Sequence, residues 1–160
     1  MSISIDLLLK HMTWANQGVY KEISNLPDEA LDAFVTNPKW TVREILHHIA
    51  TISGVLGYRI SGVKKDTLIA PESMKELQEM TGRLLQSDQF LIELAAAQDG
   101  EVEIIRKGVT QIWQRSTIIS QAIHHATEHR AQAVTALETK GYSSVNLDSF
   151  DLWVYQANSA

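Results

Sequence analysis

Apolar residues recur at intervals of three and four along most of this chain, which is the spacing of one face of an α-helix. The first stretch of this kind covers residues 4–23. Its inward positions are Leu7, Leu8, His11, Trp14, Ala15, Val19 and Ile23. The segment 25–28, which contains a proline, then predicts the end of the helix.

The second predicted helix covers residues 41–60 and has the strongest start signal in the chain. Thr41 is followed three residues later by Glu44, which is the pattern of a capping box. In that motif the hydroxyl accepts a hydrogen bond from an unpaired backbone N–H, and the carboxylate accepts one from the first residue of the motif. Ser61 and Gly62 predict the end of this helix, and residues 63–71 are expected to form a loop.

Two further long helices are predicted, over residues 72–97 and 116–140, and a short one over 148–156. Gly141 is suited to the position just beyond the fourth helix. Residues 101–113 fit no helix, because Val102, Ile104 and Ile105 alternate only weakly. This segment is either a short strand or an irregular crossover. The pattern as a whole predicts an all-α fold, a four-helix bundle with a short terminal helix, in one domain over residues 1–160.

Composition and charge narrow the function classes. The chain of 160 residues contains no cysteine, which excludes disulfides, thiolate metal sites and a cysteine nucleophile. Its net charge of −5 and its lack of a basic stripe argue against nucleic-acid binding. No signal peptide is visible at the N-terminus, and no stretch approaches the roughly 18 apolar residues of a membrane helix. We therefore expect a cytoplasmic protein with no membrane partner.

Five of the six histidines form two clusters inside predicted helices, and helical geometry assigns each of them to a face. Successive residues are rotated by about 100°. His48, His125 and His129 then fall on or beside the apolar faces of their helices, whereas His47 and His124 point outward. We expect the two outward histidines to be plain surface residues. The remaining histidine, His11, is on the inner side of the first helix, either behind the metal ligands or in the core, and we favour the core.

The three inward histidines predict a divalent-metal site. His125 and His129 are spaced i, i+4, so they lie on one face of one helix, and His48 would complete the set from another helix. Three imidazoles that leave positions open for water match a catalytic site better than a closed structural one. The alternative is that these histidines hydrogen-bond each other or a buried carboxylate, because unpaired buried imidazoles are costly.

Other residues around the predicted site have smaller roles. Gln132 could accept a hydrogen bond from the distal N–H of a ligand and so fix its tautomer. Glu128 points away from the apolar face, and no inward carboxylate is evident that could act as a general base. The four tryptophans could line a pocket, but we expect them in the core; they are Trp14, Trp40, Trp113 and Trp153.

Four segments make the chain resemble the DinB-like family of bacterial metal-binding proteins. Residues 11–16 include the opening Trp-Ala-Asn, residues 41–49 match the helix of the first ligand, and residues 125–132 match a His-x-x-x-His-Arg-Gly-Gln motif. The ending at residues 150–153 also fits. The sequence departs from the family at Glu128, where relatives commonly have a second histidine, and at Ala131, where they have glycine.

The resemblance implies a four-helix bundle, often a homodimer, that holds nickel or zinc, or else iron or manganese, through His48, His125 and His129. It also implies a metal-dependent S-transferase that joins a low-molecular-weight thiol, such as bacillithiol or mycothiol, to an electrophile. Arg59 or Arg130 could then hold a carboxylate of the thiol. Two alternatives remain open, a metal-dependent hydrolase and a non-enzymatic, stress-related metal-binding protein. The catalytic residues are unassigned.

Overall fold

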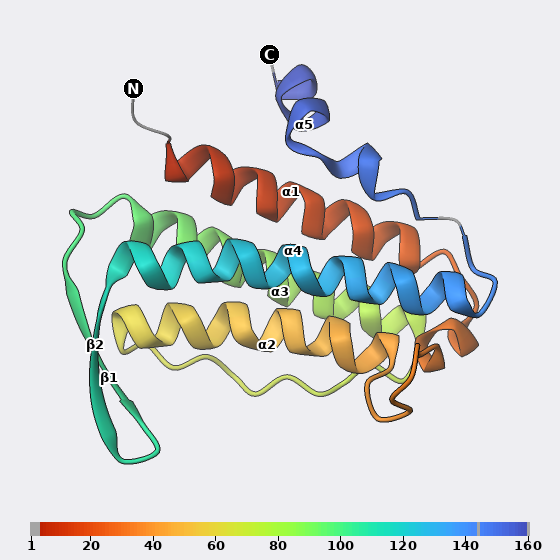
Figure 1. Ribbon diagram of the computed structural model, residues 1–160, viewed down its shortest axis with the longest axis horizontal. Helices are drawn as coiled ribbons and strands as arrows, with labels where there is room; N and C mark the ends of the chain where they lie inside the picture. The colour runs from red at the N-terminus through yellow and green to blue at the C-terminus, as the bar shows by residue number, and fades with distance from the viewer. Residues whose placement is uncertain (1–3, 144, 160) are drawn as a thin grey trace.

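Four long helices make up most of the protein and lie side by side (Figure 1). The computed structural model describes residues 4–143 and 145–159, so the predicted domain of 1–160 includes a few positions outside the described residues. The helices are α1 (Ile5–Ile23), α2 (Val42–Ser61), α3 (Met74–Ala95) and α4 (Arg115–Thr139). Helices α2 and α1 each contact both α3 and α4. The predicted, mostly helical class is confirmed, and each long helix begins and ends within two residues of its predicted bounds.

The all-α description is incomplete, because a β-hairpin connects α3 to α4 at one end of the helices (Figure 1). Strand β1 (Glu101–Arg106) pairs antiparallel with β2 (Val109–Gln114). The turn between them, Lys107 and Gly108, has φ of 52° and 77°. Two successive residues with positive φ are typical of the tight turns that match the twist of a hairpin. Of the two alternatives for this segment, the strand is therefore correct.

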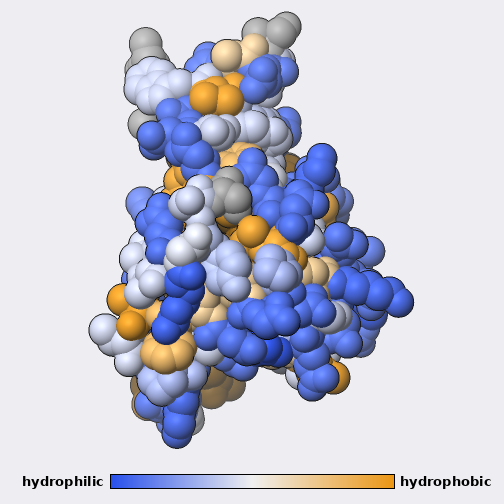
Figure 2. Space-filling model, turned by 90° about the vertical axis from the view of Figure 1, so that its right-hand side faces the viewer, coloured by the Kyte–Doolittle hydropathy of each residue, from blue (hydrophilic) through white to orange (hydrophobic). Residues whose placement is uncertain are grey.

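Three short helical elements complete the chain. The 3-10 helix η1 (Asp28–Asp32) follows α1, while η2 (Leu147–Phe150) and α5 (Leu152–Ser159) follow α4. The last two lie over α1. None of the described helices has both the length and the apolar character that a membrane crossing requires. Seen from the end opposite the hairpin, the surface is mostly hydrophilic, and apolar residues form separate patches (Figure 2).

The predicted capping box at the start of α2 is wrong, although Thr41 does occupy the N-cap position. Its hydroxyl is buried and makes no hydrogen bond. The first N–H of the helix, that of Val42, instead donates to the carbonyl of Ala33 at 2.9 Å. The end of η1 therefore supplies the acceptor, a tertiary contact that the local pattern does not reveal.

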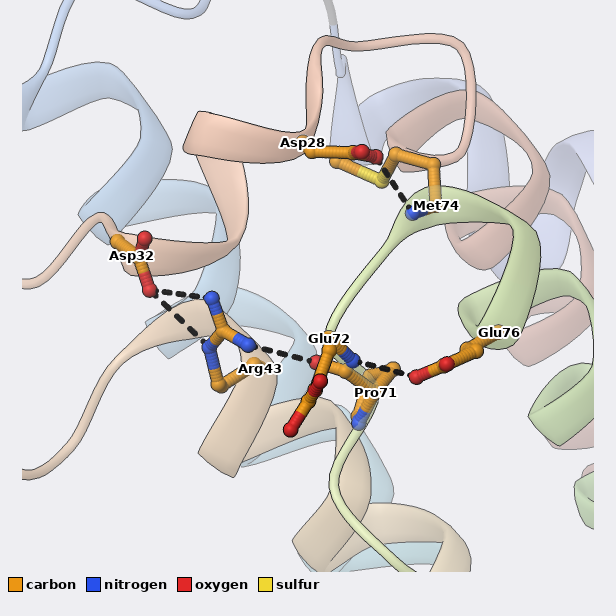
Figure 3. A network of polar contacts seen from close by, with 7 residues as sticks. All are labelled: Asp28, Asp32, Arg43, Pro71, Glu72, Met74 and Glu76. Atoms are coloured by element: carbon orange, nitrogen blue, oxygen red, sulfur yellow. Dashed lines mark hydrogen bonds and ion pairs between the residues drawn. The ribbon is translucent and has the colours of Figure 1, made fainter.

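Residues 62–73, which we call the strap, run in an extended path along α2 without regular secondary structure (Figure 1). The strap is fixed at its far end: Arg43 donates to the carbonyl of Pro71 at 2.9 Å and also binds Asp32 (Figure 3). In the middle, a ring nitrogen of His47 lies 3.1 Å from the carbonyl oxygen of Leu68. The predicted loop is confirmed, and α2 holds it in place.

The strap ends where α3 begins, at a capping arrangement like the one expected for α2. The Ser73 hydroxyl accepts from the N–H of Glu76. The Glu76 carboxylate accepts in turn from the N–H of Glu72 at 2.7 Å (Figure 3). Asp28 accepts a further bond from the N–H of Met74. These contacts satisfy backbone donors that have no partner inside the helix, and they join the strap to η1.

Candidate metal centre

Helices α2 and α4 bring together the three histidines that the helical pattern selected. His48 comes from α2, and His125 and His129 come from α4, one turn apart. Their potential ligand atoms all lie within 4.8 Å of one another. The Nε2 atoms of His48 and His125 are 3.0 Å apart. These three side chains therefore converge on one point between two helices that are far apart in the sequence.

The donor set and its spacing fit one divalent ion. Two nitrogens bound at roughly 2.1 Å in tetrahedral geometry stand about 3.4 Å apart, a value that lies between the 3.0 Å of the His48–His125 pair and the 4.8 Å within which all three ligand atoms fall. The three imidazoles are half-buried, so the centre is neither sealed in the core nor fully exposed. Three protein ligands leave at least one position for another molecule, as in catalytic sites.

Gln132 orients one of the three histidines. Its Oε1 atom lies 2.8 Å from Nδ1 of His129 and 3.2 Å from the indole nitrogen of Trp40. An indole N–H can only donate, so this contact fixes the amide with its oxygen toward both rings. His129 therefore donates from Nδ1, and its Nε2 keeps the lone pair that a metal needs. The expected role for Gln132 agrees with this geometry.

Trp40 forms a wall of the centre. Its ring centroid lies 5.4 Å from that of His48 and 5.7 Å from that of His129, with both pairs near a T-shaped arrangement. The expectation that all four tryptophans lie in the core is wrong. Trp113 on the hairpin is 44% exposed and Trp153 on α5 is 81% exposed.

Burial and mutual repulsion keep the centre ready to bind a cation. Burial, together with smaller effects of the nearby His129 and His48, lowers the pKa of His125 to about 4. The pKa of His48 is also lowered, first by burial and then by His129 and His47. Both rings are therefore neutral at neutral pH, which is the form that coordinates a metal.

The other histidines lie elsewhere. His124 is exposed, as expected. His47 is not a plain surface residue, because the strap covers it and Leu68 and Thr51 both contact its ring nitrogen. His11 is half-buried rather than in the core, and its Nε2 lies 2.8 Å from the carbonyl oxygen of Phe150. It therefore serves the contact between α1 and the C-terminal segment.

The expectation of no inward carboxylate is also wrong, because Asp88 of α3 is fully buried. Its two oxygens accept hydrogen bonds from Asn16 at 2.8 Å and from Ser53 at 2.6 Å. The oxygen of Asn16 accepts a 2.6 Å bond from Arg130, so one amide bridges a carboxylate and a guanidinium. The signal was present in the sequence: Asp88 is four residues after the buried Leu84, on the inner face of α3.

Arg130, which we expected as a candidate for holding a carboxylate near the metal, belongs instead to this buried network. Its side chain is only 5% exposed and points toward Asn16. Burial lowers its pKa to about 10, an effect that the charge of Asp88 opposes. Burial likewise raises the pKa of Asp88 to about 6, while its hydrogen bonds to Ser53 and Asn16 act against the rise. Arg130 is thus a core residue behind the centre.

Comparison with known proteins gives one match. The model of the DinB family matches residues 1–157, which is essentially the whole chain. No curated protein sequence and no solved structure matches the chain. The family assignment therefore rests on this match and on the motifs that contain the three histidines.

Proposed function

Because the chain belongs to the DinB family, we propose that it holds one divalent metal ion at His48, His125 and His129 and acts as a metal-dependent thiol S-transferase. The observation that carries the proposal is the convergence of three imidazoles within 4.8 Å, on two helices, at a half-buried position. The co-substrates are a low-molecular-weight thiol of the bacillithiol or mycothiol type and a small electrophile. By the same membership we propose a cytoplasmic homodimer and a four-helix bundle formed by α1–α4.

The ligand set favours nickel or zinc. Neutral imidazole suits Zn, Ni, Cu and Fe, whereas carboxylate and carbonyl oxygens suit Mg, Ca and Mn. No carboxylate belongs to the cluster of ligand atoms among the described residues. Iron and manganese are the alternatives, and manganese is the least suited to three nitrogens.

The chain's own residues prepare the centre for a thiol. A bound divalent ion supplies Lewis acidity, which keeps a coordinated thiol in its nucleophilic thiolate form at neutral pH. Since the chain has no cysteine, the sulfur must come from the co-substrate. Gln132 holds the His129 ring in one tautomer, and Trp40 covers one side of the ligand rings. The remaining side is where thiol and electrophile would meet.

A hydrolase is less well supported, because it needs a general base beside the metal. Asp88 is the buried carboxylate of the core, and both of its oxygens are already engaged by Asn16 and Ser53. A non-enzymatic metal-binding role shares every feature of the centre and differs only in turnover. The experiment below separates the two.

The test begins with elemental analysis of untagged protein beside a variant that lacks His48, His125 and His129. We expect about one equivalent of nickel or zinc in the wild type only. Loaded protein is then assayed for conjugation of bacillithiol or mycothiol to an electrophile. Protein that binds metal but shows no conjugation activity would favour the non-enzymatic role. Protein that binds no metal, even after reconstitution with nickel and zinc, would overturn the proposed site itself.

A further inference from the structure

A groove of about 940 Å³ is bounded by α2, the strap, α3 and β1, and none of the three candidate metal ligands lines it. Helix α2 forms its floor through Thr51, Gly54 and Val55. The strap forms one wall, α3 contributes to a second, and β1 closes one end through Ile104 and Ile105. The groove is thus assembled from four parts of the chain.

The lining is positively charged in a protein that is negative overall. Four cationic and two anionic side chains face the groove: Arg59, Lys64, Lys65 and Arg83 against Asp66 and Glu103. The formal charge of the lining is therefore +2, whereas the whole chain carries −5. An excess of positive charge in a cleft raises the local concentration of anionic ligands.

Two of the four cations are already engaged and two are available. Arg83 lies 3.1 Å from Asp66, and the ammonium of Lys65 stands 4.8 Å from the centre of the Phe90 ring. Across residues 4–143 and 145–159, no carboxylate is within ion-pairing distance of Arg59 or Lys64. These two side chains come from different elements, the end of α2 and the start of the strap.

The walls of the groove are fixed before any ligand arrives. The strap is held to α2 through Arg43 and His47, as described above. Gly54 contributes no side chain to the floor; a Cβ atom there would lie 3.5 Å from the Ser87 hydroxyl and 3.9 Å from the Lys65 side chain, so a larger side chain would occupy space between α3 and the strap. Neutral hydrogen-bonding groups, among them Thr51 and Gln86, also line the groove. A preformed site loses less entropy when it binds.

We propose that this groove binds a small, elongated molecule with two or more negative charges, carried by carboxylate or phosphate groups. Arg59 and Lys64 would pair with its anionic groups, and the apolar side chains of Val55 on the floor and Ile104 at the end would contact its body. The cations are confined to one groove instead of forming a long stripe, which favours a small molecule over nucleic acid. Val55 lies about two turns beyond His48 on α2, and none of the three histidines lines the groove. None of these residues is a proposed metal ligand, so the inference does not depend on the thiol-transferase proposal.

The test is an NMR titration of the full chain, metal-loaded, with succinate, with inorganic phosphate and with acetate as the singly charged control. We expect saturable shifts at the amides around the groove for succinate, phosphate or both, and none for acetate. Saturation by succinate alone identifies carboxylates, and saturation by phosphate alone identifies phosphate. The same titration on the variant lacking all three candidate ligands must still show binding; its loss would mean that the probe coordinates the metal, and the groove site would be wrong.

Two kinds of variant decide the location. Replacing Arg59 and Lys64 by glutamine should weaken binding about tenfold or more, because it removes two charge-assisted contacts. The matched control replaces Lys21 and Lys75, two exposed lysines outside the groove, and should bind like the wild type. Gly54→Leu, which fills the floor without changing charge, should also abolish binding. An equal loss in the control pair, or full binding by Gly54→Leu, would overturn the proposal.

Discussion

Gln132→Leu tests whether the hydrogen bond from His129, a proposed metal ligand, to Gln132 contributes to metal affinity. Leucine has nearly the volume of glutamine but accepts no hydrogen bond, so the 2.8 Å contact to His129 and the 3.2 Å contact to Trp40 are both lost. Each neutral hydrogen bond contributes about 1 kcal/mol net, and loss of such a partner typically lowers metal affinity by about 10- to 100-fold. We expect the affinity for nickel or zinc to fall about tenfold to thirtyfold.

The assay is competition against a chromophoric chelator of known affinity, at neutral pH. Gln121→Leu is the matched control, because it makes the same change at an exposed position of the same helix. We expect the control to keep the affinity of the wild type. Equal affinities for Gln132→Leu and the wild type would show that the His129 ring is held by packing alone, and the orienting role of Gln132 would have to be abandoned.

Four further predictions follow from other parts of the structure. His129→Ala should abolish metal binding and His124→Ala should preserve it, which elemental analysis checks. Loss of metal from both variants would mean that a different face of α4 is turned toward α2. Chelation should lower the Tm, since saturation at 100 times the Kd stabilises the native state by about 2.7 kcal/mol; calorimetry with and without chelator measures this. Asn16→Leu should destabilise the protein by about 3 kcal/mol or more, because the bridge between Asp88 and Arg130 is lost; denaturant unfolding that shows less than about 1 kcal/mol would contradict the bridge. The pKa of Asp88 is raised from 3.8 to about 6, so its contribution to stability is full below pH 3.8 and is lost as the pH rises through about 6. The stability of wild type relative to Asp88→Asn should therefore fall over that range, and a flat difference would rule out the raised pKa.

The sequence predicted the parts of the fold that depend on long repeats of apolar residues. Each of the four long helices buries a continuous stripe, so its period is visible without tertiary information. The hairpin could not be identified with the same clarity. In β1 only Val102 is buried, and Ile105 is 72% exposed, so the alternation expected of a half-buried strand is almost absent. The pairing with β2 also depends on the turn at Lys107 and Gly108, and the pattern of apolar residues carries no information about the conformation of that turn.

For the candidate site, too, local helix geometry predicted some features, and the others depend on tertiary contacts. The phase of two helices was enough to select His48, His125 and His129, because each direction is set by local geometry. Local geometry does not say what lies outside a helix, so it placed His47 in water although the strap covers it. It also missed Asp88, since a carboxylate on an inner face becomes plausible only once its partners from α1 and α2 are known.

The distribution of the ligands over two helices has a consequence for how the chain is connected. His125 and His129 lie one turn apart and share one helix, whereas 77 positions separate His48 from His125. An ion held by all three would therefore act as a reversible cross-link that closes a long loop. By the chain-entropy relation used for disulfides, a loop of that length corresponds to about 4.5 kcal/mol at 25 °C. A chain without cysteine would thus have a reversible cross-link in place of a disulfide. Its formation would depend on the supply of metal, whereas that of a disulfide depends on redox conditions.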